Sequence, residues 1–337
     1  MVSTMSALHD TLYRHDQLYT LAESAVTCYP EDVHGMVTEL CHSENATYRV
    51  DTPDGNRFAM RVHRTNYHNR TNIESELAWL DALRFAGFEV PQAIAGNDGH
   101  YVQSVQNGHD IKRNIVLFKW IDGVMPSIDV DMTAFQQLGA ITASLHNHSR
   151  RWAKPVWFKR LVWDHETMAG AQGHWGDWRN TAGLNDSHSR LINETLCRVR
   201  EELLGYDKGE QRYGLIHADL RLTNLLILGG TTRVIDFDDC GYGWYMHDLA
   251  AALSFIEHHQ CINNWIENWL NGYEVGGHLD DRDIAMIPTF IIQRRIQLLA
   301  WVGSHAGTKQ AQELGVEWVA QSATLCERYL GDKMLSL

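Results

Sequence analysis

The sequence has 337 residues, of which 44% are hydrophobic and 21% are charged. This composition is typical of a globular protein and excludes disordered, fibrous and low-complexity classes. The formal net charge of −13 argues against a nucleic-acid-binding surface. No apolar run reaches the roughly 18–20 residues that a membrane helix needs. The six cysteines are scattered and form no CxxC pair, which favours reduced thiols. The start of the chain lacks the apolar segment of a secretory signal. We therefore expect a cytoplasmic protein that binds neither nucleic acid nor membranes; its oligomeric state is not readable.

The first third of the chain predicts a helix followed by a β-rich segment. The turn Thr52–Asn56 joins two short strands, and apolar residues from Ile73 to Leu83 recur at helical spacing. The elements predicted here are a helix over 7–26, strands over 36–40, 47–51, 57–63, 100–104 and 114–120, and a helix over 72–86.

Beyond residues 121–123 the pattern changes to longer helical segments. The elements predicted here are helices over 131–146 and 187–204, short strands over 213–216, 225–228 and 232–235, and four helical stretches from Trp244 onward, separated near His259, Asp280 and 303–307. The chain thus predicts an α+β fold with a small β-rich lobe over 1–121, which includes the leading helix, and a larger, mostly helical lobe over 122–337.

Two polar loops carry the chemistry that the sequence suggests. The first reads His-Ala-Asp-Leu-Arg-Leu-Thr-Asn over 217–224, and Asp236 follows twelve residues after Asn224 in the segment Ile-Asp-Phe-Asp-Asp. Phosphoryl transfer from Mg-ATP needs one carboxylate to accept the proton of the attacking hydroxyl, and oxygen ligands to hold Mg²⁺. Asp219, Asn224 and Asp236 supply these groups, so the spacing favours a phosphotransferase.

These two motifs resemble the aminoglycoside phosphotransferase and homoserine kinase-like group of the protein-kinase-like superfamily, which includes stress-response-kinase-like members. The resemblance extends from about Val37 to Thr308. It implies a protein-kinase-like two-lobe fold, ATP and Mg²⁺ as cofactors, a nucleotide site in the first lobe, and catalytic and acceptor sites in the second. It also implies that Asp219 is the catalytic base and that Asn224 and Asp236 are magnesium ligands.

The same resemblance assigns roles to neighbouring residues. His217 is expected to pack the loop, and Asp248 to brace it through backbone N–H groups. Arg221 either neutralises the moving phosphoryl group or pairs with a nearby acid. Either one of Asp238 and Asp239 assists the metal through water, or they are solvated or loop-capping carboxylates.

The first lobe departs from the family pattern at its phosphate-binding residues. Arg61 stands where the superfamily has lysine, and its expected helix partner is Glu76, with Glu74 as the rival. An arginine can still bridge phosphate and carboxylate. The loop that should cover the phosphates lacks glycines and offers Ser43 and Asn45 instead.

The segment Leu117–Gly123 is the expected hinge. By resemblance, Phe118 would lie behind the adenine, while the Lys119 carbonyl and the Ile121 N–H would bond to its edge. An ordinary edge strand is the alternative, because backbone contacts leave no side-chain signature.

Acceptor recognition is the least determined feature. Tryptophans between Arg151 and Asp177 either hold a polar or cationic acceptor or pack an irregular segment, and we favour packing. Arg294 and Arg295 either select an anionic acceptor or are surface or ion-paired residues.

Three functions remain open at this point. The leading one is a Mg-ATP-dependent kinase that acts on a hydroxyl of a small molecule. A serine/threonine protein kinase is the second, although no D-F-G and A-P-E activation segment is present and little chain separates Asp236 from the next helix. A nucleotide-binding regulatory module with weak activity is the third, supported by Arg61 and the glycine-poor loop.

Overall fold

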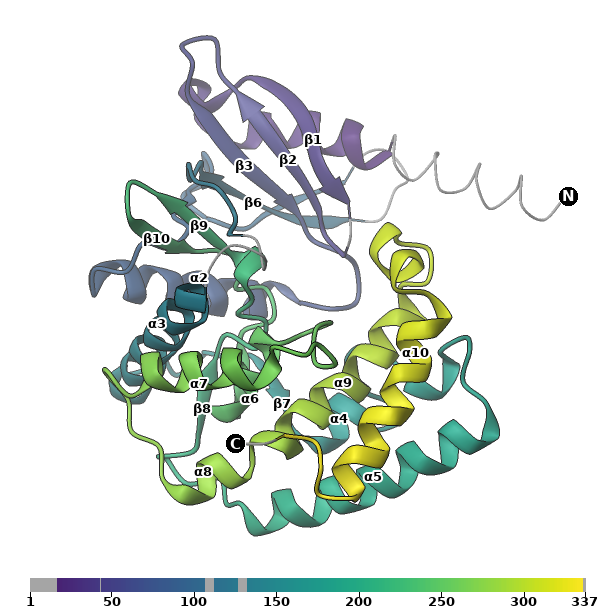
Figure 1. The fold of residues 1–337 in the computed structure, drawn as a ribbon. Helices are drawn as coiled ribbons and strands as arrows, with labels where there is room; N and C mark the ends of the chain where they lie inside the picture. Colours follow the sequence, from purple (N-terminus) through teal and green to yellow (C-terminus); the bar gives the residue numbers. More distant parts are fainter. Residues whose placement is uncertain (1–16, 43, 107–111, 127–131, 336–337) are drawn as a thin grey trace, which may run out of the picture. The chain divides into compact units, whose positions relative to one another are not determined.

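The computed structural model describes residues 17–42, 44–106, 112–126 and 132–335. It divides into two compact units (Figure 1). The first comprises Met1–Gly123 together with Pro155–Lys159, and the second comprises Val124–Lys154 and Arg160–Leu337. Within the described residues, no helix is long and apolar enough to cross a membrane.

The first unit is built on a six-stranded antiparallel sheet of order β1-β2-β3-β6-β4, with β5 paired to β6. Its strands are β1 (Met36–His42), β2 (Ala46–Asp51), β3 (Arg57–Val62), β4 (Ala93–Ile94), β5 (Gln103–Val105) and β6 (Arg113–Lys119). Every predicted strand of this segment is confirmed, although β5 begins three residues later than expected. The sequence did not predict β4, because two residues are too few to show alternation.

One face of this sheet is covered by the start of the described chain. Residues 17–25 are helical, while 7–16 of the predicted leading helix lie outside the described residues. Leu21 and Ala25 pack in one core with Tyr48 and Val50, which alternate with more exposed residues along β2. Two short 3₁₀ helices, η1 (Val26–Cys28) and η2 (Glu31–Val33), follow. The alternation explains why this strand was readable from sequence.

Helix α2 (Arg70–Phe85) confirms the helix predicted over 72–86. It begins where the side chain of Asn69 accepts a hydrogen bond from the N–H of Asn72, which satisfies a free donor of the first turn. The buried face includes Ile73 and Leu77, as the apolar spacing indicated. This helix also buries Glu76, which belongs to the candidate site described below.

The second unit contains two small sheets. In the three-stranded sheet, β11 (Gly241–Trp244) pairs in parallel with β7 (Leu161–Trp163) and antiparallel with β8 (Tyr213–Ile216). Strands β9 (Leu225–Leu228) and β10 (Thr231–Val234) form a hairpin. The strands β8, β9 and β10 were predicted, whereas β7 and β11 were not. Glycine leaves β11 without an apolar pattern, yet a Cβ at Gly241 would lie 2.5 Å from the Leu161 carbonyl oxygen.

The rest of the second unit is helical (Figure 1). Its elements are α3 (Met132–Arg151), α4 (His165–Ala169), η3 (Trp178–Asn180), α5 (Asp186–Gly205), η4 (Leu222–Asn224), α6 (Met246–Ala252), α7 (Ile262–Tyr273), α8 (Asp281–Ala285), α9 (Ile287–Ser304) and α10 (Lys309–Leu330). The helices predicted over 131–146 and 187–204 are confirmed. The stretch predicted after Asp280 is divided into α8 and α9, and Pro288 stands in the first turn of α9.

Helix α9 is the central helix of the second unit. Its residues are buried at almost every position, and it packs against α4, α5, α6 and α10. A helix buried on all sides is expected to be apolar throughout. Four polar residues nevertheless occupy its middle, and all are at most 1% exposed: Gln293, Arg294, Arg295 and Gln297.

Candidate active site

The loop that carries Asp219 has an unusual backbone conformation at Ala218. It leaves β8 at Ile216 and ends in η4. Ala218 has a φ of 66°, in the left-handed region that residues other than glycine rarely adopt. Asp248 of α6 holds this conformation, because its carboxylate accepts the N–H groups of His217 at 3.2 Å and of Ala218 at 2.7 Å. The bracing role predicted for Asp248 is confirmed, and such strain is common at functional sites.

Asp248 is itself fixed from two other helices. His146 of α3 donates from Nε2 to Asp248 at 2.9 Å and accepts at Nδ1 from the Tyr273 hydroxyl of α7, also at 2.9 Å. Burial disfavours the charge on Asp248, but the hydrogen bond from His146 outweighs it, so the pKa of Asp248 is lowered. Burial lowers the pKa of His146 as well, which favours the neutral ring. No motif singled out His146 beyond its place on a predicted helix.

Three side chains converge on the carboxylate of Asp219. Asn224 donates from Nδ2 to the Asp219 carbonyl oxygen at 2.8 Å and to Oδ2 at 3.1 Å. Arg221 approaches with Nε at 3.2 Å, and Arg294 with Nη2 at 2.6 Å from Oδ1. Arg221 thus makes the ion pair that was one of its two predicted roles. The side chain of Asp219 remains 14% exposed.

The hairpin β9–β10 brings Asp236 beside this loop. Val234 pairs with Leu225, and the N–H of Ile235 donates to the Asn224 carbonyl at 2.9 Å. His217 donates from Nε2 to the Ile235 carbonyl at 3.2 Å. The predicted packing role of His217 is therefore confirmed. Asp236 follows directly, exposed and with a φ of 62°.

The residues after Asp236 are anchored through their backbone. Trp163 donates from Nε1 to the Asp239 carbonyl at 2.7 Å, and Arg160 donates to the carbonyl of Asp238. Asp238 is 5% exposed and therefore not solvated, so its remaining predicted roles are loop capping and water-mediated assistance to the metal. The anchoring keeps the second polar loop against β7.

The oxygen donors fit a metal that is held partly by its substrate. The amide nitrogen of Asn224 is engaged with Asp219, so its oxygen is the atom available to ligate a cation. Among the described residues, no group of three or more His, Cys, Asp or Glu side chains forms a metal site. Mg²⁺ commonly takes one or two protein oxygens and completes its shell with phosphates and water. Asn224 and Asp236 could serve such a cation.

In the first unit, Arg61 and Glu76 form a buried ion pair. Arg61 on β3 donates from Nη2 to both carboxylate oxygens of Glu76 on α2, at 2.7 and 2.8 Å. The rival Glu74 instead pairs with Arg70 at 2.8 Å on the more exposed side of the helix. Glu76 is therefore the partner of Arg61, as expected. The Arg61 guanidinium lies 5.2 Å from the ring centre of Phe118.

The remaining predicted nucleotide-binding residues are less closely grouped. Ser43 lies outside the described residues. The Asn45 side chain accepts the N–H of Arg64 at 2.9 Å, so it stabilises the chain after β3. Phe118 and Lys119 end β6, where Phe118 is buried and Lys119 is exposed, and Ile121 follows, half-buried.

The tryptophan-rich segment mainly serves packing, which is the reading we favoured. Trp163 and Trp175 are buried with ring centres 5.7 Å apart, whereas Trp157 is 49% exposed. The surface alternative for Arg294 and Arg295 is wrong, because both are buried and ion-paired. Sequence reasoning missed the place of Arg294 beside Asp219. The signal was present as a polar cluster in the middle of an otherwise apolar helix.

Comparison with known proteins places this geometry in a family. The model of the phosphotransferase enzyme family matches residues 41–285. A solved structure of a microcompartment-associated aminopropanol kinase is 41% identical, with a TM-score of 0.86, and the match covers 94% of this chain and 99% of that one.

Two more distant relatives share the fold. Amicoumacin kinase hAmiN, solved in complex with AMP-PNP, Ca²⁺ and Ami, is 21% identical with a TM-score of 0.76, and the match covers 95% of each chain. Amicoumacin kinase from Bacillus subtilis (strain 168) is 23% identical over 269 residues, 76% of each chain. The α+β, protein-kinase-like fold expected from the sequence is confirmed. This chain belongs to the phosphotransferase enzyme family.

Proposed function

We propose that this protein transfers the γ-phosphoryl group of ATP to a hydroxyl group of a small amino alcohol. The observation that carries the proposal is the arrangement of Asp219, whose loop is fixed by Asp248 and whose carboxylate meets Asn224. The amino-alcohol class is supported by the aminopropanol kinase, which is 41% identical over nearly the whole chain.

In this proposal Asp219 is the general base. Its carboxylate accepts the proton of the acceptor hydroxyl as the hydroxyl oxygen bonds to the γ-phosphorus and the bond to the bridging oxygen of ADP breaks. The proton leaves Asp219 for solvent after the phosphorylated product departs. Arg221 carries a positive charge at 3.2 Å from Asp219, where it can also attract the phosphoryl group.

The divalent cation of the proposal is Mg²⁺, held by the amide oxygen of Asn224 and the carboxylate of Asp236. When bound, it would neutralise the charge of the phosphates. The complex of a distant relative with AMP-PNP and Ca²⁺ supports a nucleotide and a divalent ion in this family. Asp236 suits the role because it is exposed and adjacent to Ile235, whose N–H is bound to Asn224.

The nucleotide-binding residues of the first unit remain predictions. We propose that Arg61 contacts the phosphates while Glu76 holds its guanidinium by two hydrogen bonds. Phe118, the Lys119 carbonyl and the Ile121 N–H are proposed to bind the adenine. The lobe boundaries and the cytoplasmic location also stay predictions.

The experiment is an assay of ADP release with purified protein, Mg-ATP and a panel of acceptors. The panel contains aminopropanol, the corresponding propanediol without an amine, and a serine-containing peptide. The proposal expects turnover with the amino alcohol, loss of turnover in Asp219→Asn, and much weaker turnover with the diol. Equal activity on the peptide would favour the protein-kinase alternative. ATP binding without turnover on any acceptor would favour the regulatory module.

A further inference from the structure

Arg294 makes more contacts than packing in α9 requires. It is 1% exposed, and the indole of Trp175 lies 4.7 Å from its guanidinium carbon. Such a buried charge is stable only where its donors are satisfied. Its four hydrogen bonds go to Asp219 Oδ1 at 2.6 Å, the Ser254 hydroxyl at 2.9 Å, Gln297 Oε1 at 3.2 Å and the Ala218 carbonyl at 3.3 Å.

These contacts divide into two groups with different consequences. Two contacts fix the guanidinium in place: Ser254, in the chain after α6, and Gln297, in α9 itself. The guanidinium then presents Nη2 to Asp219 Oδ1 and Nη1 to the backbone of the strained loop. Because Arg294 cannot rotate, the short contact at 2.6 Å allows the carboxylate one orientation.

We propose that Arg294 is a positioning residue for the phosphoryl transfer: it holds Oδ1 of Asp219 so that Oδ2 is presented to the acceptor hydroxyl. Arg221 Nε lies 3.2 Å from both oxygens, and Oδ2 is the less tightly held one, because its shortest contact is Asn224 Nδ2 at 3.1 Å against 2.6 Å for Arg294 on Oδ1. The inference rests on the proposed function, since it assigns Arg294 a role through Asp219. A base that is already held in the productive orientation speeds the chemical step, because no conformational entropy is lost in orienting it.

The neighbouring Arg295 provides a matched control. It is 0% exposed on the same helix, but its contacts lead away from Asp219. They go to Glu257 Oε2, the Ser322 hydroxyl and the Trp318 carbonyl, each at 2.7 Å. Substitution of Arg295 therefore tests the effect of disturbing a buried arginine of α9 without touching the base.

The experiment measures kcat and KM for Mg-ATP and for the amino alcohol in Arg294→Met, Arg294→Lys and Arg295→Lys, with thermal unfolding of each. A misplaced reacting group typically lowers the rate about 100-fold. We expect kcat of Arg294→Met to fall about 100-fold while KM for Mg-ATP changes less than about threefold. Arg294→Lys should recover about tenfold of that loss, because its ammonium can reach Oδ1. Arg295→Lys should lower the unfolding temperature and keep kcat within about threefold.

A double-mutant cycle with Asp219→Asn decides whether Arg294 acts through the base. If it does, Arg294→Met adds no further loss to the residual rate of Asp219→Asn. If the rate losses of Arg294→Met and Asp219→Asn instead multiply in the double variant, the inference is overturned, since Arg294 would then act on another group. A kcat within about threefold of the parent in Arg294→Met, or an equal fall of kcat in Arg295→Lys, would overturn it too.

Two further results keep the test decisive. If Arg294→Met does not fold, Arg294→Lys and Ser254→Ala replace it in the cycle. Ser254→Ala should lower kcat several-fold in the parent and leave kcat unchanged in Asp219→Asn. If neither Arg294→Lys nor Ser254→Ala lowers kcat in the parent, the inference is rejected. If Asp219→Asn retains full turnover, the proposed function itself fails. Failure of the proposed function, seen in Asp219→Asn, can thus be distinguished from failure of the inference about Arg294.

Discussion

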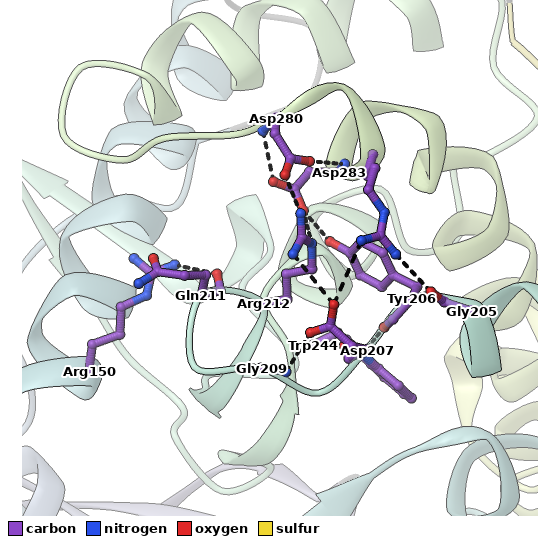
Figure 2. Close-up of polar contacts among 11 residues, drawn as sticks. Arg150, Gly205, Tyr206, Asp207, Gly209, Gln211, Arg212, Trp244, Asp280 and Asp283 are labelled. Carbon is purple, nitrogen blue, oxygen red and sulfur yellow. Dashed lines mark hydrogen bonds and ion pairs between the residues drawn. The ribbon is translucent and has the colours of Figure 1, made fainter.

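Two of the clusters in the second unit where arginine meets carboxylate, one around Arg212 and one around Asp219, are built in opposite ways. The cluster around Arg212 joins the chain after α5 to the start of α8 (Figure 2). Arg212 lies 3.1 Å from Asp283 and 3.6 Å from Asp207, and it also contacts Asp280. Carboxylates outnumber cations at this arginine, and the side chains of Asp207 and Asp280 remain 53% and 44% exposed.

Around Asp219, cations outnumber carboxylates. One carboxylate meets two arginines and an asparagine, and one of these arginines is fully buried. The backbone beside it is left-handed at Ala218, whereas the Arg212 cluster is closed by ordinary capping hydrogen bonds between Asp280 and Asp283. Exposed ion pairs contribute little stability, and solvent screens them. The same residue types therefore join two partly exposed segments around Arg212, whereas around Asp219 they hold a single carboxylate, the one that we propose as the base.

The largest expected effect separates the two clusters directly. Asp219→Asn keeps the shape of the side chain but removes the base, so turnover should fall about 10³-fold or more. ATP affinity, measured by calorimetry, should change less than about threefold, because the base acts on the acceptor. Asp207→Asn is the matched control and should leave turnover unchanged. Turnover in Asp219→Asn within a few-fold of the parent would erase the distinction between the clusters.

A smaller effect is expected for the proposed metal ligand. Asp236→Asn should weaken Mg-ATP binding by at least the roughly 10–100-fold that follows loss of a group supporting a metal ligand. Calorimetry at low and high Mg²⁺ checks this, since excess metal should restore part of the affinity. Unchanged nucleotide affinity at low Mg²⁺ would contradict the assignment of Asp236.

Substitution within the Arg212 cluster should change stability and spare catalysis. Asp283 accepts hydrogen bonds from the Tyr206 hydroxyl and from Arg212 Nε, and it is 8% exposed. Asp283→Asn should lower the free energy of unfolding by about 1–3 kcal/mol, because buried donors lose a charged acceptor. Urea unfolding measures the loss, and kcat of the folded protein should stay within about twofold. A large fall of kcat would show that this cluster also supports the reaction.

The smallest effect is a pH dependence of stability near the Asp219 cluster. Burial and the charge of Arg294 lower the pKa of His247 to about 3, against the opposing charges of Asp248 and Asp219. Below a pH of about 6.5 the unfolded chain therefore binds a proton that the folded chain does not. This contribution is fully present above pH 6.5 and is lost as the pH falls toward 3, at up to about 1.4 kcal/mol per pH unit. Unfolding curves at pH 7 and pH 5.5 for the parent and His247→Gln measure it; identical pH slopes would contradict it.

Much of the fold was predictable because its elements have clear local patterns. Strand β2 of the first sheet alternates buried and more exposed residues, and α2 shows a clean apolar stripe. Strands β7 and β11 were missed because three or four residues such as Gly241–Trp244 carry no alternation. Their pairing depends on partners that are distant in the chain.

The candidate site shows the same division. The spacing of Asp219, Asn224 and Asp236 indicated phosphoryl transfer, and the hairpin register brings their two loops together. Arg294 was read as a surface or ion-paired residue, since a single arginine on a predicted helix carries no sign of what it faces. Its partner is 75 residues away in sequence.

The chemistry that we propose was predictable from local spacing, because the candidate base, the candidate metal ligands and the turn residues all lie within two short loops. The contacts that hold the Asp219 carboxylate come from tertiary packing, which no local pattern in the chain shows. Burying α9 against α6 puts Arg294 beside Asp219, and in that interior each nitrogen of the guanidinium has a protein partner.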